Sequence, residues 1–311
     1  MSVELAVVIP YYKRKYFDET LKSFAAQTNK AFTVYIGDDC SPEAPVDIIN
    51  KYSSQLKIVY KRFDSNLGGR DLVGQWKRCI DLTNGERWLW LFSDDDVVGS
   101  KCVESFYKTV TIAPVFDVYH FDVHVIDCEG SVIHKAKRFP DIISYDELFV
   151  RNGKGHLPSF VVEYVFSRDV YQEKAGFVSF PYAWGSDIAT WCKFSRSKGV
   201  KTIQGDEVYW RSSDINITPD TSLTYEKTLA IIKCLKWYKD YFNSKKINKE
   251  IPRVFFYHLF FNSTHLTRFQ ISELLQKATE AEVLPKIWGS YLSRGRIIKI
   301  LRELKNLLQR K

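Results

Sequence analysis

Short apolar runs alternate with amphipathic stretches through the first hundred residues of the chain. Buried strands are expected at the apolar runs of residues 4–10, 32–39, 56–63 and 88–92. Helices are expected between them, where apolar residues recur at helical spacing, at residues 17–27, 46–52 and 72–82. This alternation predicts an α/β fold with a Rossmann-like, mostly parallel sheet flanked by helices. Ligands bind such sheets beyond the carboxyl ends of the strands.

The pattern changes after about residue 115. Residues 117–127 alternate strictly and are followed by turn residues, which predicts an added β-hairpin. His120 and His124 share the polar face of its first strand, about 13 Å apart, too far to hold one metal ion, so we expect them to be solvated or hydrogen-bonded. Beyond Leu223 the spacing is mostly helical. We therefore expect a domain over residues 1–222, with halves 1–115 and 116–222, and a helical C-terminal extension over residues 223–311.

Composition is that of an ordinary globular protein. The 311 residues are 45% apolar and 15% aromatic, enough to bury a full core. The six cysteines are scattered without a C-x-x-C pair, which favours a reducing compartment over a zinc site or disulfide framework. The N-terminus lacks the features of a signal peptide, and no apolar window is long enough to span a bilayer. These features predict a cytoplasmic location.

The net charge of +8 is concentrated near the C-terminus. Residues 293–311 combine an apolar stripe at helical spacing with seven flanking lysines and arginines, which predicts a basic amphipathic helix. Two interpretations stay open: the helix packs on its own domain, or it binds an anionic membrane surface peripherally, on the inner face. The basic residues do not form an aromatic-interleaved patch, so nucleic acid is not an expected partner.

Acidic residues cluster at two of the predicted strand ends. Asp94, Asp95 and Asp96 directly follow the aromatic strand at residues 88–92, while Asp38 and Asp39 end the second strand. Adjacent carboxylates at the end of an apolar strand repel one another and lose hydration, so the arrangement is unfavourable without a cation opposite it. The sequence therefore predicts a cationic ligand at this edge of the sheet.

Five motifs stand in an order that resembles the family 2 glycosyltransferases of the GT-A fold, of the bacterial polysaccharide type. They are VVIPYYKR, GDDCSPE, NLGGRD, FSDDDVV and AWGSDIATW, and they cover residues 3 to about 195. The resemblance implies an inverting transfer of a sugar from a nucleotide diphosphate donor, expected to be a UDP-sugar. The acceptor would be a hydroxyl of a growing cell-surface glycan, either free or lipid-linked.

The resemblance also implies roles for the acidic cluster. A divalent cation, Mn²⁺ or Mg²⁺, would join the pyrophosphate to the protein, and Asp94 would hold the ribose. The register of the motif leaves two metal ligands open. If Ser93 occupies the first acidic position the ligand is Asp95, and if Asp94 and Asp96 form the functional pair it is Asp96.

Further nucleotide contacts follow from the same resemblance. They would come from the end of the opening strand at Pro10 and Tyr11, and from Asp38 and Asp39, one of which would meet the base and the other the ribose. Arg70 would lie near the nucleotide, with a surface salt bridge as its alternative role.

The acceptor half supplies the base in this resemblance. Asp187 would take the proton from the acceptor hydroxyl, with Trp184 and Trp191 excluding water from it and stacking on a sugar ring. Asp187 could also cap the helix that follows it. Arg211 is a candidate for a contact to the diphosphate.

Two other classes of protein compete with this interpretation. A nucleotidyltransferase would carry a glycine-rich loop after the first strand, and PYYKRKYFDETL contains no glycine. A non-catalytic module that binds nucleotide-sugars or carbohydrate would need no base at position 187. Loss of turnover on substitution of Asp187, with donor binding retained, distinguishes the enzyme from the module.

Overall fold

The computed structural model describes residues 4–213 and 221–286. The basic segment at residues 293–311, for which an amphipathic helix is expected, lies outside these residues. None of the described helices is both long enough and apolar enough to cross a membrane.

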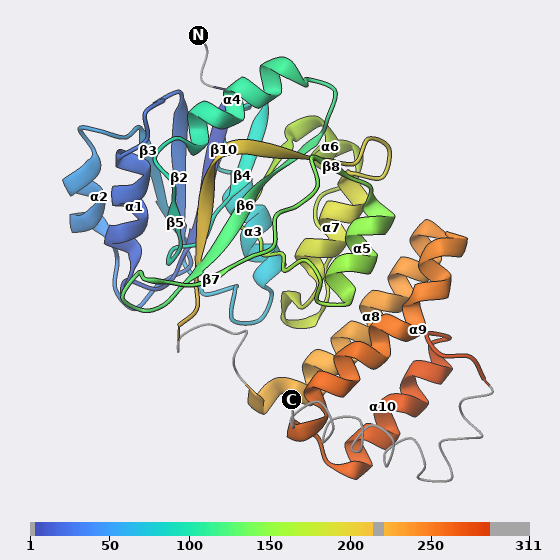
Figure 1. The fold of residues 1–311 in the computed structure, drawn as a ribbon. Coiled ribbons are helices and arrows are strands. Elements are labelled where there is room, and N and C mark those ends of the chain that lie inside the picture. Colours follow the sequence, from blue (N-terminus) through green and yellow to red (C-terminus); the bar gives the residue numbers. More distant parts are fainter. Residues whose placement is uncertain (1–3, 214–220, 287–311) are drawn as a thin grey trace.

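One mixed sheet forms the centre of the fold (Figure 1). Its main path runs in the order β3-β2-β1-β4-β9-β6-β10-β5, with β7 paired to β6 and β8 to β10. The strands are β1 Leu5–Tyr11, β2 Phe32–Asp38, β3 Ile58–Arg62, β4 Trp88–Leu91, β5 Val97–Val98, β6 Val118–Ile126, β7 Val132–Lys135, β8 Ile142–Ile143, β9 Tyr164–Ser167 and β10 Val200–Arg211. Strands β1 to β4 are parallel, and β9 is antiparallel to both of its neighbours, β4 and β6. The predicted mostly parallel sheet is therefore confirmed.

Helices cover both faces of this sheet. The α-helices in the described residues are α1 Phe17–Ala25, α2 Val46–Tyr52, α3 Leu72–Ile80, α4 Cys102–Ile112, α5 Tyr145–Gly153, α6 Arg168–Glu173, α7 Ser186–Phe194, α8 Thr224–Phe242, α9 Lys245–Asn262 and α10 Arg268–Glu280. Three single turns of 3-10 helix lie at Pro181–Ala183, Thr221–Leu223 and Ser263–His265. Helices α1, α2 and α4 cover one face, and α3, α5, α6 and α7 cover the other.

The two-residue period of the strands produces these two layers. In β4, Trp88 and Trp90 point into the core shared with α1, α2 and α4, whereas Leu89 and Leu91 point into the core shared with α3, α5 and α7. All four side chains are at most 1% exposed. An unbroken apolar run is what a strand buried on both faces requires.

The predicted hairpin is present as β6 and β7, which pair antiparallel. His120 on β6 differs from the expectation of a solvated or hydrogen-bonded residue. It is fully buried, stacks on Phe139 at 3.8 Å, and neither ring nitrogen has a hydrogen-bond partner. Phe139 and Tyr164 pack against its ring, so this position on the strand has no solvated face.

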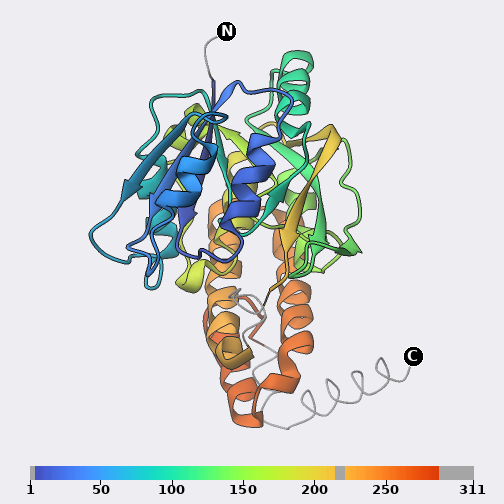
Figure 2. The ribbon, with the colours of Figure 1, turned by 90° about the vertical axis from the view of Figure 1, so that its left-hand side faces the viewer.

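Helices α8, α9 and α10 extend away from the sheet as a separate group (Figures 1 and 2). They stay in contact with the sheet layer through α5 and α7. A side chain at Gly153, the last residue of α5, would come within 2.8 Å of Val254 on α9, so glycine permits this close approach. Buried side chains of these helices belong to the same core as Leu89 and Leu91. The domain boundary at residue 222 stays a prediction.

Candidate active site

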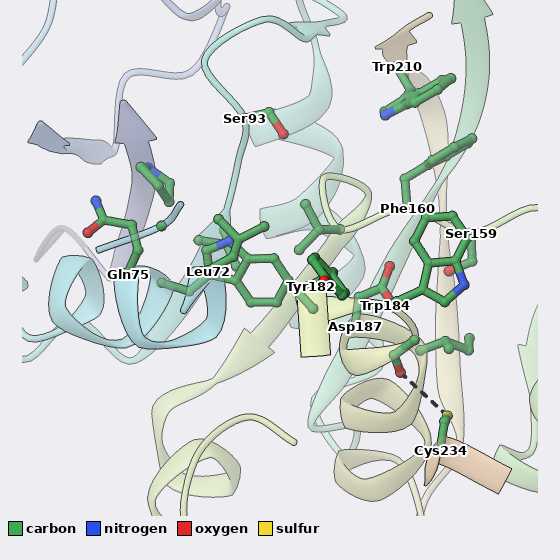
Figure 3. Close-up of a pocket in the computed structure, with 18 of the residues that line it drawn as sticks. Leu72, Gln75, Ser93, Ser159, Phe160, Tyr182, Trp184, Asp187, Trp210 and Cys234 are labelled. Carbon is green, nitrogen blue, oxygen red and sulfur yellow. Dashed lines mark hydrogen bonds between the residues drawn. The ribbon is translucent and has the colours of Figure 1, made fainter. Parts of the chain in front are cut away.

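A cavity of about 670 Å³ lies beyond the carboxyl ends of β1, β2 and β4 (Figure 3). From this edge of the sheet it reaches past the loop before α7 to helices α8 and α9. Pro10, Tyr11, Asp39 and Asp187 border it, as the sequence predicts for parts of one site. Segments far apart in the chain therefore meet in one cavity of the size usual for small-molecule sites.

The three aspartates of the acidic turn after β4 have different surroundings, two at the cavity and one in the core. Asp94 and Asp95 border the cavity, and Asp94 Oδ2 accepts hydrogen bonds from the backbone N–H groups of Tyr12 and Lys13, both at 2.7 Å. Asp96 is fully buried, and its Oδ1 accepts from the backbone N–H of Arg211 at 2.6 Å. Asp96 does not border the cavity, and its Oδ2 is buried without a hydrogen-bond partner, whereas Asp95 does border it. Asp95 is therefore the better placed of the two predicted metal ligands, and the choice between them stays a prediction.

Burial makes negative charge on this turn unfavourable. Loss of hydration, and then the neighbouring charge of Asp95, raise the pKa of Asp94 to about 7. Burial also raises the pKa of Asp95, against the opposing charges of Lys13 and Arg211. A cation bound beside Asp95 would favour the ionised carboxylates. The turn thus has the electrostatics expected of a cation site.

These residues do not form a complete metal cage by themselves. Within residues 4–213 and 221–286, no group of three His, Cys, Asp or Glu side chains could hold a metal ion. Mg²⁺ and similar ions at nucleotide sites are commonly bound by one or two carboxylates and complete their coordination with water and phosphate oxygens. Asp95, with Asp94 beside it, fits that donor set.

Asp38 and Asp39 have different surroundings. Asp38 is fully buried, and its carboxylate accepts from Ser41 N at 2.8 Å, Tyr60 Oη at 2.7 Å and Arg62 Nη1 at 2.8 Å. It does not border the cavity, so its expected contact to the base or ribose is corrected. This carboxylate instead ties the end of β2 to β3.

Asp39 borders the cavity and holds the loop that follows β3. Its carboxylate accepts from the backbone N–H groups of Leu67 at 2.7 Å and Gly68 at 2.8 Å, from Asn66 Nδ2 at 3.1 Å, and from Arg78. A Cβ at position 68 would lie 2.7 Å from Asp39 Oδ2, which explains the glycine there. The loop brings Asn66 and Gly68 to the wall of the cavity.

The two arginines predicted to contact the nucleotide lie elsewhere. Arg70 is exposed and does not border the cavity. Arg211 is fully buried: its guanidinium donates to the carbonyls of Asp95 at 2.8 Å and Asp127 at 3.0 Å and to Glu19 Oε2 at 2.6 Å, and it lies 4.3 Å from the ring centre of Tyr16. These contacts correct the expectation of a diphosphate contact. Arg211 instead stabilises the acidic turn from the core, through its hydrogen bond to the Asp95 carbonyl.

We expect Arg211→Met to lower the free energy of unfolding by about 3 to 5 kcal/mol, because buried carbonyls of the acidic turn and the β6–β7 turn lose a charged donor. Urea denaturation measures this change, and Arg70→Met, at an exposed position, is the matched control. Unchanged unfolding together with weakened binding of UDP would instead return Arg211 to the nucleotide site.

Asp187 enters the cavity at the first turn of α7, after a loop with unusual backbone geometry (Figure 3). Tyr182 and Ala183 have φ values of 59° and 54°, and Gly185 has 80°. Left-handed backbone at non-glycine residues is uncommon and is concentrated at functional sites. Burial raises the pKa of Asp187 to about 6, partly offset by backbone N–H groups at the start of the helix. A carboxylate with this pKa is suited to accept a proton near neutral pH.

The aromatic residues around Asp187 are only partly those expected. Trp184 borders the cavity beside the carboxylate, whereas Trp191 is fully buried against Tyr164, with ring centres 4.7 Å apart, and does not border it. Phe160 and Trp210 do border it, stacked on each other at 4.2 Å. Stacking of one ring on another across segments 50 residues apart in the chain leaves no local sequence signal.

Sequence reasoning also missed Lys13, and it considered Glu163 only as an alternative acceptor-side carboxylate, not as a support for Phe160. Among the described residues that border the cavity, Lys13 is the one lysine or arginine. Its place just after β1, beside an acidic turn, was a signal that could have identified it. The backbone N–H of Phe160 donates to Glu163 Oε1 at 2.7 Å, and Glu163 is fully buried with its Oε1 3.8 Å from His120 Nε2. Glu163 therefore orders the cavity wall from the core.

Comparison with known proteins agrees with this fold. The family model described as glycosyl transferase family 2 matches residues 6–173, more than half of the chain. Over 132 residues the chain is 30% identical to the poly(ribitol-phosphate) beta-N-acetylglucosaminyltransferase TarS of Staphylococcus aureus, a match that covers 41% of this chain and 21% of TarS. Over 161 residues it is 26% identical to an uncharacterized glycosyltransferase of Haemophilus influenzae, covering 51% of this chain and 52% of that protein.

Solved structures extend the likeness to most of the chain. The crystal structure of S. aureus TarS residues 1–349 in complex with UDP-GlcNAc has a TM-score of 0.58 at 14% identity and covers 91% of this chain and 88% of that one. The structure of GalNAc-T7 with UDP, GalNAc and Mn²⁺ has a TM-score of 0.50 at 10% identity and covers 67% and 44%. These likenesses show the fold, which is GT-A. The chain belongs to glycosyl transferase family 2.

Proposed function

We propose that this protein is an inverting glycosyltransferase that moves a sugar from a UDP-sugar to a hydroxyl of a cell-surface glycan. The observation that supports this proposal best is that one cavity contains both the acidic turn at Asp94 and Asp95 and the carboxylate of Asp187. A donor held at the turn would present its sugar to an acceptor beside Asp187. Family membership and the UDP-GlcNAc bound by TarS agree with a nucleotide-sugar donor.

The donor would lie against the sheet edge. Pro10, Tyr11 and the Asp39-braced loop would border the nucleotide, and Asp94 would accept from the ribose. A divalent cation held by Asp95 would neutralise the charge that develops on the diphosphate as its bond to the sugar breaks. Lys13 lies where it can add a second positive charge near the phosphates.

The acceptor would approach from the side of Asp187. Its carboxylate would take the proton of the acceptor hydroxyl as that oxygen attacks the anomeric carbon on the face opposite the diphosphate. Trp184 would limit access of water to the carboxylate. Attack from the opposite face inverts the configuration at the anomeric carbon.

A thermal-shift screen of UDP-sugars, with and without Mn²⁺, tests donor use. A donor at about 100 times its dissociation constant should stabilise the protein by about 2.7 kcal/mol. We expect stabilisation by at least one UDP-sugar that is larger with Mn²⁺ than with EDTA. Absence of any shift across UDP-, GDP- and dTDP-sugars would contradict the proposed donor class.

Lys13→Ala and Arg70→Ala form a matched pair of charge removals. We expect Lys13→Ala to weaken binding of UDP about tenfold or more, since a hydrogen bond to a charged group contributes about 1.5 to 3 kcal/mol. Arg70→Ala should leave the affinity unchanged, because Arg70 is exposed and away from the cavity. Titration calorimetry measures both. Weaker binding of UDP by Arg70→Ala, with unchanged binding by Lys13→Ala, would place the phosphates near the loop that carries Arg70.

Peripheral binding to an anionic membrane is a further part of the proposal and depends on sequence alone. Each basic side chain near such a surface contributes about 1 kcal/mol, so a chain truncated before Ser293 should bind anionic vesicles much less than the full chain, and salt should weaken binding of the full chain. Co-sedimentation measures this. Equal binding by both chains would assign the segment a role within its own protein.

A further inference from the structure

The cavity has two chemically different ends, and Asp187 lies between them. At the sheet edge its wall carries polar side chains such as Lys13, Asn66, Ser93 and Asp95. At the far end the wall is made by α5, α7, α8 and α9. We call this far end the apolar arm and define it by Phe149, Ile188, Ile231, Leu235 and Val254.

The apolar arm is enclosed and is not part of an exposed surface patch. Phe149, Leu235 and Val254 are at most 3% exposed and Ile231 is 7% exposed, yet all of them border the cavity. Cavities with such walls stay dry and bind apolar molecules. Three polar side chains, Asn152, Tyr238 and His258, also border this end of the cavity, so the hydroxyls of a sugar placed there would find hydrogen-bond partners only at these points.

The arm begins directly at the proposed base. Ile188 is the next residue after Asp187 on α7, and Cys234 on α8 lies 3.9 Å from the carbonyl oxygen of Gly185, just before α7 (Figure 3). The attacking hydroxyl must come close to Asp187. An acceptor group that extends from that hydroxyl to the side away from the sheet edge would reach α8 and α9.

Charge argues against an anionic polymer in this arm. The one lysine or arginine among the described residues of the cavity wall, Lys13, lies at the sheet end. His258 on α9 also borders the cavity, but burial lowers its pKa to about 4 and so leaves it neutral. Among the described residues no lysine or arginine borders this arm, although Lys227 on α8 has its Nζ 4.7 Å from the ring centre of Trp184, which borders the cavity. The arm thus offers little to a polyphosphate chain such as the poly(ribitol-phosphate) named for TarS.

From this division of the cavity we propose that the acceptor is a sugar attached to a linear hydrocarbon chain, and that the apolar arm holds the first part of that chain. This inference rests on the proposed function and specifies its acceptor class. The sugar would place its hydroxyl at Asp187 between the donor and the arm. The hydrocarbon would enter between α7 and the α8–α9 pair.

An alkyl glycoside series tests the proposal without knowledge of the natural acceptor. Methyl, butyl and octyl β-D-glucoside are titrated calorimetrically into the full chain with UDP and Mn²⁺, below the critical micelle concentration. Each methylene that enters the arm should raise affinity about fourfold. We expect a steep rise from methyl to octyl glucoside, and equal affinity along the series would overturn the proposal.

Two substitutions locate the bound chain. Ile231→Phe fills the arm and should reduce the gain from methyl to octyl at least tenfold, whereas Ile231→Ala enlarges it and should preserve or increase the gain. Leu229→Phe, on α8 but away from the cavity wall, is the matched control and should change nothing. An unchanged gain in both Ile231 variants would place the alkyl chain elsewhere and overturn the proposal.

Binding of UDP is measured in every variant, so that a failure of the apolar-arm proposal can be distinguished from a failure of the proposed function. UDP binding with equal affinity for all glucosides contradicts the apolar arm alone. Failure of the wild-type chain to bind UDP or any UDP-sugar contradicts the proposed function itself.

Discussion

Asp187→Asn is expected to reduce transfer to acceptor by about 10²- to 10⁴-fold, the usual contribution of a positioned base. The substitution keeps the size of the side chain and removes its basicity. Affinity for the donor should remain, because the nucleotide contacts lie at the sheet edge. Steady-state kinetics and calorimetry with UDP measure the two effects. Nearly full activity at saturating donor and acceptor would contradict the assignment.

The pKa of Asp187 sets the pH dependence of the same reaction. Because burial raises that pKa to about 6, the wild-type rate should fall as pH drops below about 6 and the carboxylate becomes protonated. This acid limb should disappear in Asp187→Asn. A rate that stays constant down to pH 5 would show that another group accepts the proton.

The unfolding temperature of Asp187→Asn distinguishes loss of the catalytic base from misfolding. An acid whose pKa is raised by folding destabilises the native state at pH values above its ordinary pKa, because its charged form is disfavoured there. Asp187→Asn should therefore unfold at the same or a higher temperature at pH 7. Asp169→Asn is the matched control, since Asp169 also lies in the first turn of a helix but is exposed. It should alter neither stability nor rate substantially.

Asp95→Asn is expected to abolish the dependence of donor binding on Mn²⁺ and to lower turnover by on the order of 10²-fold or more. The reason is that the cation contributes several kcal/mol of charge stabilisation at the diphosphate. Calorimetry with Mn²⁺ and with EDTA should give the same donor affinity for this variant. The wild-type chain should bind the donor much more weakly in EDTA.

Asp96→Asn provides the matched control one residue away. Asp96 faces the core and accepts from Arg211 N, and burial raises its pKa well above the ordinary value, so a neutral side chain of the same shape should be tolerated. We expect it to retain the effect of Mn²⁺. Loss of that effect in Asp96→Asn and not in Asp95→Asn would reverse the assignment of the ligand.

The sheet and its edge could be predicted because they depend on periodicity within short segments. Apolar runs such as residues 88–92 bury both faces of a strand, and carboxyl ends of parallel strands meet at one edge. The cavity accordingly includes Asp39, Asp94 and Asp187. The helical region beyond Leu223 was likewise evident from spacing, and the described part of it forms three helices.

What could not be predicted is which of two adjacent residues faces the cavity. Asp38 and Asp39, or Asp95 and Asp96, differ only in the direction that the turn gives to each side chain. That direction is fixed by partners distant in sequence, such as Tyr60 for Asp38 and Arg211 for Asp96. The sequence suggested a ligand contact for Arg211, but the partners of its guanidinium in the structure are backbone carbonyls and the Glu19 carboxylate.

The most direct test of the proposed reaction uses water as the acceptor. Each UDP-α-sugar that binds is incubated with the protein and Mn²⁺, and the sugar first released is followed by proton NMR before its anomers equilibrate. An inverting enzyme should release the β-anomer, and Asp187→Asn should release it much more slowly. First release of the α-anomer would contradict inverting catalysis by this site.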